Sequence, residues 1–353
     1  MTILSRRLPL LMLAAALGPA VAHAQQPASY DLPATPGTVA YGYYWSQATP
    51  ALRIRSGDRV TVHGMITNTP QGLMRAGVDS ARIQQSLRDI VRDVTGARRG
   101  PGGHILTGPI YVEGADSGDV LEVRFLSLHP DIDYAYNSFS TRSGFIPEDF
   151  TTGKTRIIPL DTIRNVAHFA DGIDIPLRPF FGSVGVAPPA AMGRVNSAPP
   201  GIYAGNLDNK ELVAGTTLYI PVWTPGALLE IGDGHAGMGN GEVDITAMET
   251  SLRGTVQIIV RKDMHLKWPR AETPTHWITM GIDSNLVTAA KNAVREAIDF
   301  LVTERHMTRE DAYMLCSVAV DFDITELVDG TVGVHAMIPK NIFAASGGRK
   351  GGQ

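Results

Sequence analysis

Four groups able to bind a metal or move a proton stand close together in one glycine-rich stretch. Residues 230–250 have the sequence EIGDGHAGMGNGEVDITAMET, and four polar residues stand between its glycines: Asp233, His235, Asn240 and Glu242. Glycine inside a regular element costs roughly 0.5–1 kcal/mol of folding free energy. We therefore expect the backbone here to bend sharply or to lie close to another atom.

Two further glycine-rich segments also contain polar groups. GPGGHILTGP contains His104, and GIYAGNLDNKEL contains Asn206, Asp208 and Lys210. Two neutral imidazoles with one or two carboxylates suit a zinc-type ion that keeps an open position. Such an ion lowers the pKa of bound water to about 7 and polarises a carbonyl. This set of groups indicates hydrolysis of an amide or ester.

Each candidate residue has an expected role in that chemistry. We expect five metal ligands: His104, Asp208, Asp233, His235 and Glu242. Asp208 and Glu242 are also the candidate proton carriers, and the sequence does not show which of the two carries the proton. Asn206 and Lys210 are expected to hold the substrate carbonyl or the developing oxyanion. On loops and strand ends, spacing alone does not show whether these side chains converge.

Nucleophilic catalysis by serine or cysteine has little support. The chain has no G-x-S-x-G elbow, which is the usual turn for a nucleophilic serine. Its single cysteine, Cys316, lies in the apolar run AYMLCSVAV, which predicts a buried, inert thiol. One cysteine also excludes a disulfide within the chain. A metal-activated water is the route that remains.

The elements that must position these groups are mostly strands. Alternating or β-branched apolar patterns bounded by turn residues cover 58–66, 110–128, 216–234 and 251–263. Helices are expected over 79–96, over 284–306 and from Thr308, where Asp311 completes a capping box. The sequence therefore predicts a mainly β protein with packed sandwich or barrel parts over 25–270. A smaller α+β part is expected over 271–345.

The first residues and the overall charge indicate where the protein works. MTILSRRLPLLMLAAALGPAVAHAQQ has a basic start, a short apolar run and an A-x-A site at 22–24, typical of a secretory signal peptide over 1–24. We expect a periplasmic or secreted protein that is not inserted in the membrane after cleavage, with a disordered tail over 346–353. The formal net charge is −4 and no basic run is visible, which argues against nucleic acid as a partner.

Three long segments together resemble the acetamidase/formamidase family: 104–123, 199–250 and 323–343. The similarity runs from about residue 50 to about residue 345. It implies hydrolysis of small aliphatic amides, such as formamide or acetamide, to a carboxylate and ammonia. It also implies packed β-sandwich or barrel subdomains with a smaller α/β portion, a divalent metal of the zinc type and a homo-oligomer.

Two features depart from the family pattern. Asn240 stands where the family usually has an acid, in a motif that also includes Asp233, His235 and Glu242. The signal peptide is the second departure, since amide-using members are commonly cytosolic. Two alternatives therefore stay open: an exported binding or structural protein on an inactivated amidase scaffold, and a metal-dependent γ-lactamase.

Overall fold

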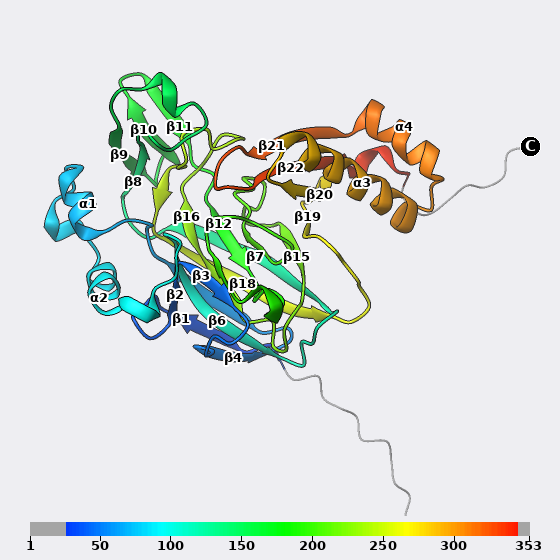
Figure 1. Ribbon diagram of the computed structural model, residues 1–353, viewed down its shortest axis with the longest axis horizontal. Coiled ribbons are helices and arrows are strands. Elements are labelled where there is room, and N and C mark those ends of the chain that lie inside the picture. Colours follow the sequence, from blue (N-terminus) through cyan, green and yellow to red (C-terminus); the bar gives the residue numbers. More distant parts are fainter. Residues whose placement is uncertain (1–25, 345–353) are drawn as a thin grey trace, which may run out of the picture.

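The computed structural model describes residues 26–344, which form two large β-sheets, one small sheet and four α-helices (Figure 1). The mainly β fold with a smaller α+β part is confirmed. The predicted signal peptide (1–24) and the predicted tail (346–353) lie outside the described residues. Among the described residues, no helix is both long and apolar enough to span a bilayer.

The first sheet has nine strands in the spatial order β1-β5-β18-β7-β15-β19-β20-β22-β21. In chain order these are β1 Ser29–Leu32, β5 Arg59–Gly64, β7 Val120–Pro130, β15 Thr217–Pro221, β18 Leu252–Arg261, β19 Arg270–Glu272, β20 His276–Asp283, β21 Asp321–Glu326 and β22 Val332–Pro339. Only β1 and β5 pair in parallel. The strands expected over 58–66 and 251–263 are β5 and β18, which are direct neighbours.

The second sheet has eleven strands. Its main path is β11-β10-β9-β8-β17-β16-β12-β14, and β6 joins β16 to β2 and β4. In chain order these are β2 Val39–Tyr41, β4 Leu52–Arg55, β6 Ile105–Glu113, β8 Tyr134–Phe139, β9 Lys154–Asp161, β10 Val166–Ala170, β11 Ile173–Pro176, β12 Phe180–Gly185, β14 Ala204–Asn206, β16 Leu229–His235 and β17 Glu249–Thr250. A separate pair consists of β3 Tyr43–Trp45 and β13 Arg194–Asn196.

The two large sheets pack on one another through a shared apolar core. Phe125 and Ile258 of the first sheet lie in one buried cluster with Phe181 and Ile231 of the second. The Phe181 ring lies directly over a glycine of the first sheet: a Cβ added at Gly254 would lie 2.4 Å from its Cε2 atom. This close packing of side chains between two sheets is the β-sandwich arrangement expected from the sequence.

The helices lie at the edges of the sandwich (Figure 1). They are α1 Pro70–Arg75, α2 Gln85–Asp93, α3 Leu286–Arg305 and α4 Arg309–Ala319, and 3₁₀ turns cover Ser80–Arg82, Gly96–Arg98, Pro147–Asp149, Ala190–Met192 and Lys340–Ile342. The helix expected over 79–96 is shorter than expected, because both of its ends are 3₁₀ turns. The Thr308 side chain accepts from the amide of Asp311, as the capping box predicts.

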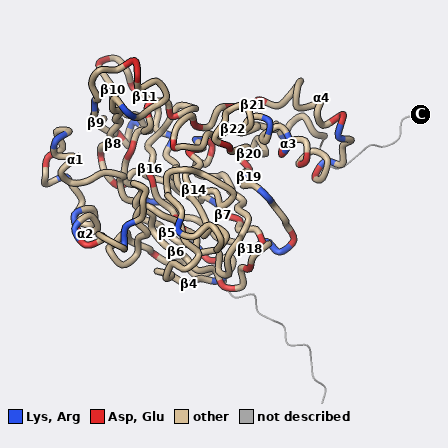
Figure 2. The backbone as a smooth tube through the Cα atoms, in the orientation of Figure 1, with Lys and Arg blue, Asp and Glu red and all other residues tan. Residues whose placement is uncertain are grey.

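The C-terminal strands continue the first sheet, and α3 covers them. β20, β22 and β21 follow β19 in that sheet, so the expected boundary between residues 270 and 271 falls within β19. The division into 25–270 and 271–345 stays a prediction. Cys316 lies on the buried face of α4, and burial raises the pKa of its thiol, in agreement with an inert role. Basic and acidic residues are interspersed along the chain (Figure 2).

Candidate metal centre and active site

Asp233 and His235 both lie on β16, in the interior of the second sheet. Alternate residues of a strand project to the same face, so the two side chains meet: His235 Nε2 lies 3.3 Å from Asp233 Oδ2. Asp233 Oδ1 also accepts a 3.0 Å hydrogen bond from the Thr67 hydroxyl. Both residues are buried, with 3% and 0% of their surface exposed.

The glycines around them allow neighbouring strands to approach β16 closely. A Cβ added at Gly232 would lie 2.4 Å from the carbonyl oxygen of Ile105 on β6. One added at Gly234 would lie 2.6 Å from the carbonyl oxygen of Thr250 on β17. The close approach expected from the sequence is confirmed, and it explains why glycine alternates with functional groups along this strand.

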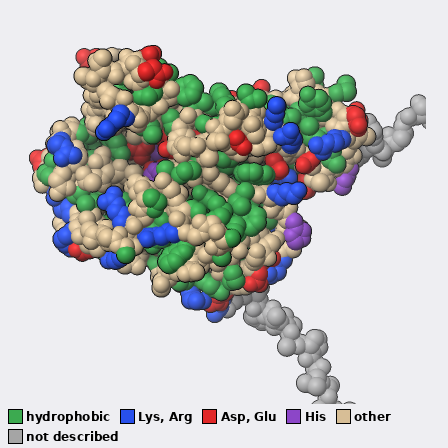
Figure 3. Space-filling view, viewed as in Figure 1, with side chains coloured by type: hydrophobic (Ala, Val, Ile, Leu, Met, Phe, Trp, Pro, Cys, Tyr) green, Lys and Arg blue, Asp and Glu red, His purple; other side chains and the backbone are tan. Residues whose placement is uncertain are grey.

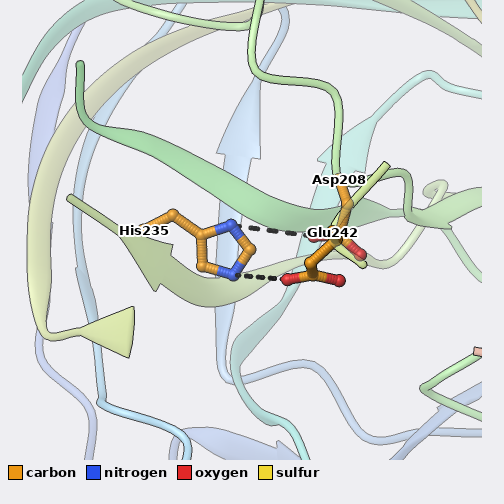
Figure 4. A group of neighbouring side chains, drawn as sticks. All are labelled: Asp208, His235 and Glu242. Carbon is orange, nitrogen blue, oxygen red and sulfur yellow. Dashed lines mark ion pairs between the residues drawn. The ribbon is translucent and has the colours of Figure 1, made fainter. Parts of the chain in front are cut away.

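Three further carboxylates surround the His235 ring. Its Nδ1 atom lies 3.8 Å from Asp208 Oδ1, and its Nε2 atom lies 4.0 Å from Glu242 Oε1 (Figure 4). Nε2 also lies 3.2 Å from Glu249 Oε1, because β17 pairs with β16 and sets Glu249 opposite His235. None of these approaches has hydrogen-bond geometry, so both ring nitrogens are buried without a hydrogen-bond partner.

His104, which comes directly before β6, approaches the same cluster. Its Nε2 atom lies 3.9 Å from Asp233 Oδ2. Its Nδ1 atom lies 3.2 Å from the Ser197 carbonyl oxygen and 3.1 Å from the Ser197 hydroxyl. A proton on Nδ1 would bond to that carbonyl and leave the Nε2 lone pair directed toward Asp233, as in many metal-binding histidines.

A small cavity of about 50 Å³ opens onto these groups, and it is lined by Thr67, His104, Tyr136, Asn206, Asp233, Glu242, Ile245, Thr246, Glu249 and Asp329. A larger cavity of about 440 Å³ shares Glu242 and Thr246 with it and is lined mainly by apolar side chains. The space-filling view shows acidic side chains beside a histidine in a hollow of this face (Figure 3). A molecule in the larger cavity can therefore reach Glu242.

The space between the ligating groups fits a bound cation. A Cβ added at Gly182 on β12 would lie 2.3 Å from Asp208 Oδ1, 2.7 Å from Asp233 Oδ2 and 2.7 Å from His235 Cε1. Asp208 Oδ1 and one oxygen of Glu249 are buried without hydrogen-bond partners. Buried polar atoms are usually paired. Carboxylate oxygens that are buried beside an imidazole without a hydrogen-bond partner are the ligand atoms that an ion site requires.

Burial and mutual repulsion shift the pKa values of these groups. Burial raises the pKa of the Asp208 and Glu242 carboxyls well above the usual range, and neighbouring carboxylates raise both further. Burial alone would lower the pKa of His235, but the charges of Glu249 and Asp233 outweigh it and hold this pKa well above its ordinary value. Burial alone would raise the pKa of Asp233, but His104 and His235 lower it below its ordinary value.

Asn206 has contacts that differ from the expected ones, and Lys210 does not line the small cavity. The Asn206 amide donates to Asp208 Oδ2 at 2.5 Å and to Asp329 Oδ2 at 3.0 Å. Its donors are therefore engaged in holding two carboxylates. Lys210 is half-buried and is absent from the lining of the small cavity, and its charge acts on the pKa of His335. The oxyanion role of Asn206 and Lys210 stays a prediction without a supporting contact.

Three acidic residues of the site were missed by the sequence analysis: Glu249, Glu326 and Asp329. Glu249 and Glu326 are buried, with 4% and 0% of their surface exposed. Glu249 lies within the glycine-rich stretch 230–250, but only strand pairing places it opposite His235. Glu326 and Asp329 come from the segment DITELVDG, where no local pattern distinguishes them from surface acids.

Known proteins are similar to this chain over most of its length. The model of the Acetamidase/Formamidase family matches residues 78–198 and 190–345. The formamidase of Methylophilus methylotrophus is 25% identical over 191 residues, which are 40% of this chain and 47% of that protein. The chain spans about half the length of the curated relatives it matches.

Solved structures match over most of the chain. A protein of Thermoanaerobacter tengcongensis described as a predicted acetamidase/formamidase is 25% identical, with a TM-score of 0.75 over 89% of this chain and 97% of that one. The acetamidase of Yersinia enterocolitica is 28% identical, with a TM-score of 0.75 over 92% of this chain and 96% of that one. The similarity therefore includes both large sheets and the C-terminal strands.

Proposed function

Since the chain belongs to the acetamidase/formamidase family, we propose that it hydrolyses the linear C–N bond of small aliphatic amides. The observation that carries the proposal is the convergence of His104 and the buried carboxylates of Asp233, Glu242 and Glu249 on a cavity of about 50 Å³. His235 lies in contact with two of these carboxylates, Asp233 and Glu249. In the reaction, the oxygen of water bonds to the amide carbonyl carbon, the C–N bond breaks, and the nitrogen takes a proton. The products are a carboxylate and ammonia.

The residues best placed to hold a zinc-type ion are His235, Asp233 and Glu249, with His104 next to Asp233. One ligand atom from each of Asp233, His235 and Glu249 lies within 4.8 Å of the other two. Mixed imidazole and carboxylate donors are the usual set for catalytic zinc. When bound, such an ion supplies Lewis acidity toward the carbonyl and favours ionisation of water.

Glu242 is the group best placed to carry the proton. It lines both cavities, whereas Asp208 lines neither. The pKa of Glu242 is raised well above its usual range, first by burial and then by the Asp208 charge. A carboxyl whose pKa lies closer to neutrality exchanges protons more readily at working pH. Asp208 is instead held in place beside His235 by the amide of Asn206.

The cavity volume supports a small substrate. One water needs roughly 10–15 Å³ of this kind of space, so about 50 Å³ admits a molecule of only a few heavy atoms next to Asp233 and Glu249. Formamide and acetamide satisfy this limit. A longer acyl group would have to extend past Glu242 into the larger, more apolar cavity.

The test is ammonia release from formamide and acetamide, measured before chelation, after chelation and after zinc is added back. We expect release that disappears with chelator and returns with zinc. His235→Gln should reduce it by at least about 100-fold. Glu230→Gln is the matched control, because Glu230 is buried on the same strand, has an unpartnered carboxyl oxygen and lines neither cavity.

A γ-lactam and a zinc-binding measurement complete the experiment. Faster turnover of the γ-lactam than of acetamide would contradict the linear-amide proposal in favour of lactamase activity. Zinc binding with no turnover of any amide would contradict hydrolysis and favour a binding role.

Asn240 lines the larger cavity, and its side-chain oxygen is buried without a hydrogen-bond partner. Export and homo-oligomerisation stay predictions.

A further inference from the structure

We propose that Asp208, Glu326 and Asp329 form a second cation site, which takes a hard divalent ion such as Mg²⁺, Mn²⁺ or Ca²⁺. The three carboxylates offer ligand atoms that all lie within 4.8 Å of one another. This second site would lie next to the histidine-containing site, because Asp208 also lies 3.8 Å from His235. This inference concerns binding and goes beyond the proposed hydrolysis.

Glu326 provides the first independent argument. It is the last residue of β21 and none of its surface is exposed. Both of its carboxylate oxygens are buried without a hydrogen-bond partner. An unpaired buried carboxylate costs several kcal/mol of folding free energy, so Glu326 must be neutralised at this point, either by a proton or by a bound cation.

Asn206 holds the other two carboxylates in place. Its amide nitrogen donates to one oxygen of Asp208 and to one oxygen of Asp329. Its own oxygen accepts from the hydroxyl of Ser183, which fixes the amide orientation. The second oxygen of Asp208 stays without a hydrogen bond. Ligating carboxylates are commonly oriented by such outer hydrogen bonds.

The backbone fixes Glu326 against the loop that carries Glu242. The amide of Gly241 donates to the Thr325 carbonyl at 2.9 Å, and the amide of Leu327 donates to the Gly241 carbonyl at 2.9 Å. Residues 241 and 326 thereby form a parallel bridge. The acidic cluster is therefore held by main-chain contacts on both sides, independently of any charge.

The balance of charge supports a second ion. Six carboxyl groups gather here: Asp208, Asp233, Glu242, Glu249, Glu326 and Asp329. Within residues 26–344, the titratable groups of opposite charge that form ion-pair contacts with these carboxyls are the imidazoles of His104 and His235. With both imidazoles neutral as metal ligands, one divalent ion would offset two negative charges, and a second would offset two more.

The two sites differ in donor chemistry. The first includes imidazole nitrogen, which zinc accepts readily. The second consists of carboxylate oxygens alone, which suit Mg²⁺, Mn²⁺ and Ca²⁺. The two sites should therefore be separable by the metal supplied, with zinc filling the first and a hard cation the second.

The test counts ions bound to the whole protein. After chelation, one equivalent of Zn²⁺ is added and Mn²⁺ is then titrated, with bound Mn²⁺ followed by electron paramagnetic resonance. We expect one further Mn²⁺ per chain in the wild type. Glu326→Gln should weaken this Mn²⁺ by at least about tenfold, while Zn²⁺ binding remains. Glu230→Gln, another buried glutamate with an unpartnered oxygen, should bind both ions.

Two results would overturn the proposal. One is zinc-loaded wild type that takes up no Mn²⁺, which would mean that Glu326 and Asp329 share protons instead of a cation. The other is Mn²⁺ uptake that is equal in the wild type and in a folded Glu326→Gln variant. If Glu326→Gln does not fold, Asp329→Asn gives the same comparison. Because ammonia release is assayed separately, failure of this site and failure of the proposed hydrolysis are distinguished.

Discussion

At the scale of single residues, the candidate site depends on a glycine, because this residue has no side chain to fill the space beside the ligands. Gly182 lies on β12 beneath Asp208, Asp233 and His235, and any Cβ there would occupy the space between their ligating atoms. The atoms that it would displace are side-chain ends, which can move, but their movement would separate the ligands. Gly182 therefore determines the room left for a cation at the candidate metal centre without contributing a ligand atom.

Gly182→Ala is expected to weaken zinc binding by at least about tenfold and to lower amide hydrolysis by about 100-fold. The matched control is Gly239→Ala, where an added Cβ would meet no atom within 4 Å. Both variants are compared by zinc titration and by ammonia release. Normal zinc affinity in Gly182→Ala would show that the ion does not occupy the space beside β12.

At the scale of elements, the packing of α3 on β20 supports the sheet that delivers Glu326. Gly281 on β20 faces α3 so closely that a Cβ would lie 2.2 Å from the Ala289 carbonyl oxygen and 2.2 Å from the Ala293 amide nitrogen. These are backbone atoms of a helix, which cannot move aside cheaply. β20 also pairs with β22, which pairs with β21. A shift of α3 would therefore move β21 and the Glu326 side chain that it carries.

Gly281→Ala should force α3 away from the sheet and destabilise the protein by about 1–3 kcal/mol or more, as overpacking of a core does. Its thermal midpoint should fall, and Mn²⁺ binding should weaken together with it. Gly37→Ala serves as the control, since its added Cβ would have only an ordinary contact at 3.9 Å. An unchanged midpoint in Gly281→Ala would contradict close helix packing.

At the scale of the whole molecule, a buried acidic cluster links stability to pH and to metal. Burial raises the pKa of Asp208, Glu242 and Glu326 well above the usual range. Without metal, the folded chain therefore holds protons that the unfolded chain releases, and stability falls as pH rises through the folded pKa values. The raised pKa of His235 acts in the same direction. Metal binding requires the deprotonated ligands.

The chelated protein should therefore lose stability as pH rises above about 4, the ordinary pKa of these carboxyls, and the stabilisation by zinc should grow as pH rises. The expected loss is about 1.4 kcal/mol per pH unit for each proton held only by the folded chain. His335, whose pKa burial lowers to about 4, loses its stabilising effect only as pH falls below its unfolded pKa of about 6.5. Thermal unfolding with chelator and with zinc measures both curves. A zinc effect that is independent of pH would contradict ligation by these carboxyls.

The parts of this architecture that could be predicted from sequence are those with local signals. The cap of α4, the alternating strands, and the glycines around Asp233 and His235 each follow from residues within a few positions. Glu249 and Glu326 could not be predicted, because strand pairing and chain packing, and not local spacing, bring them to the site. Opposition of Glu249 to His235 depends on the register of β16 and β17, and the 241–326 bridge depends on packing of the whole chain.

The origin of Glu326 and Asp329 also has a consequence for biosynthesis. His104 leaves the ribosome long before Asp329, and at about 5–20 residues per second the delay is on the order of tens of seconds. During this time the nascent chain lacks two of the three carboxylates of the proposed second site, so a cation captured there early would be held weakly and exchanged. Loading of that site should therefore follow translation, which means that the compartment where folding is completed determines which hard cation it acquires.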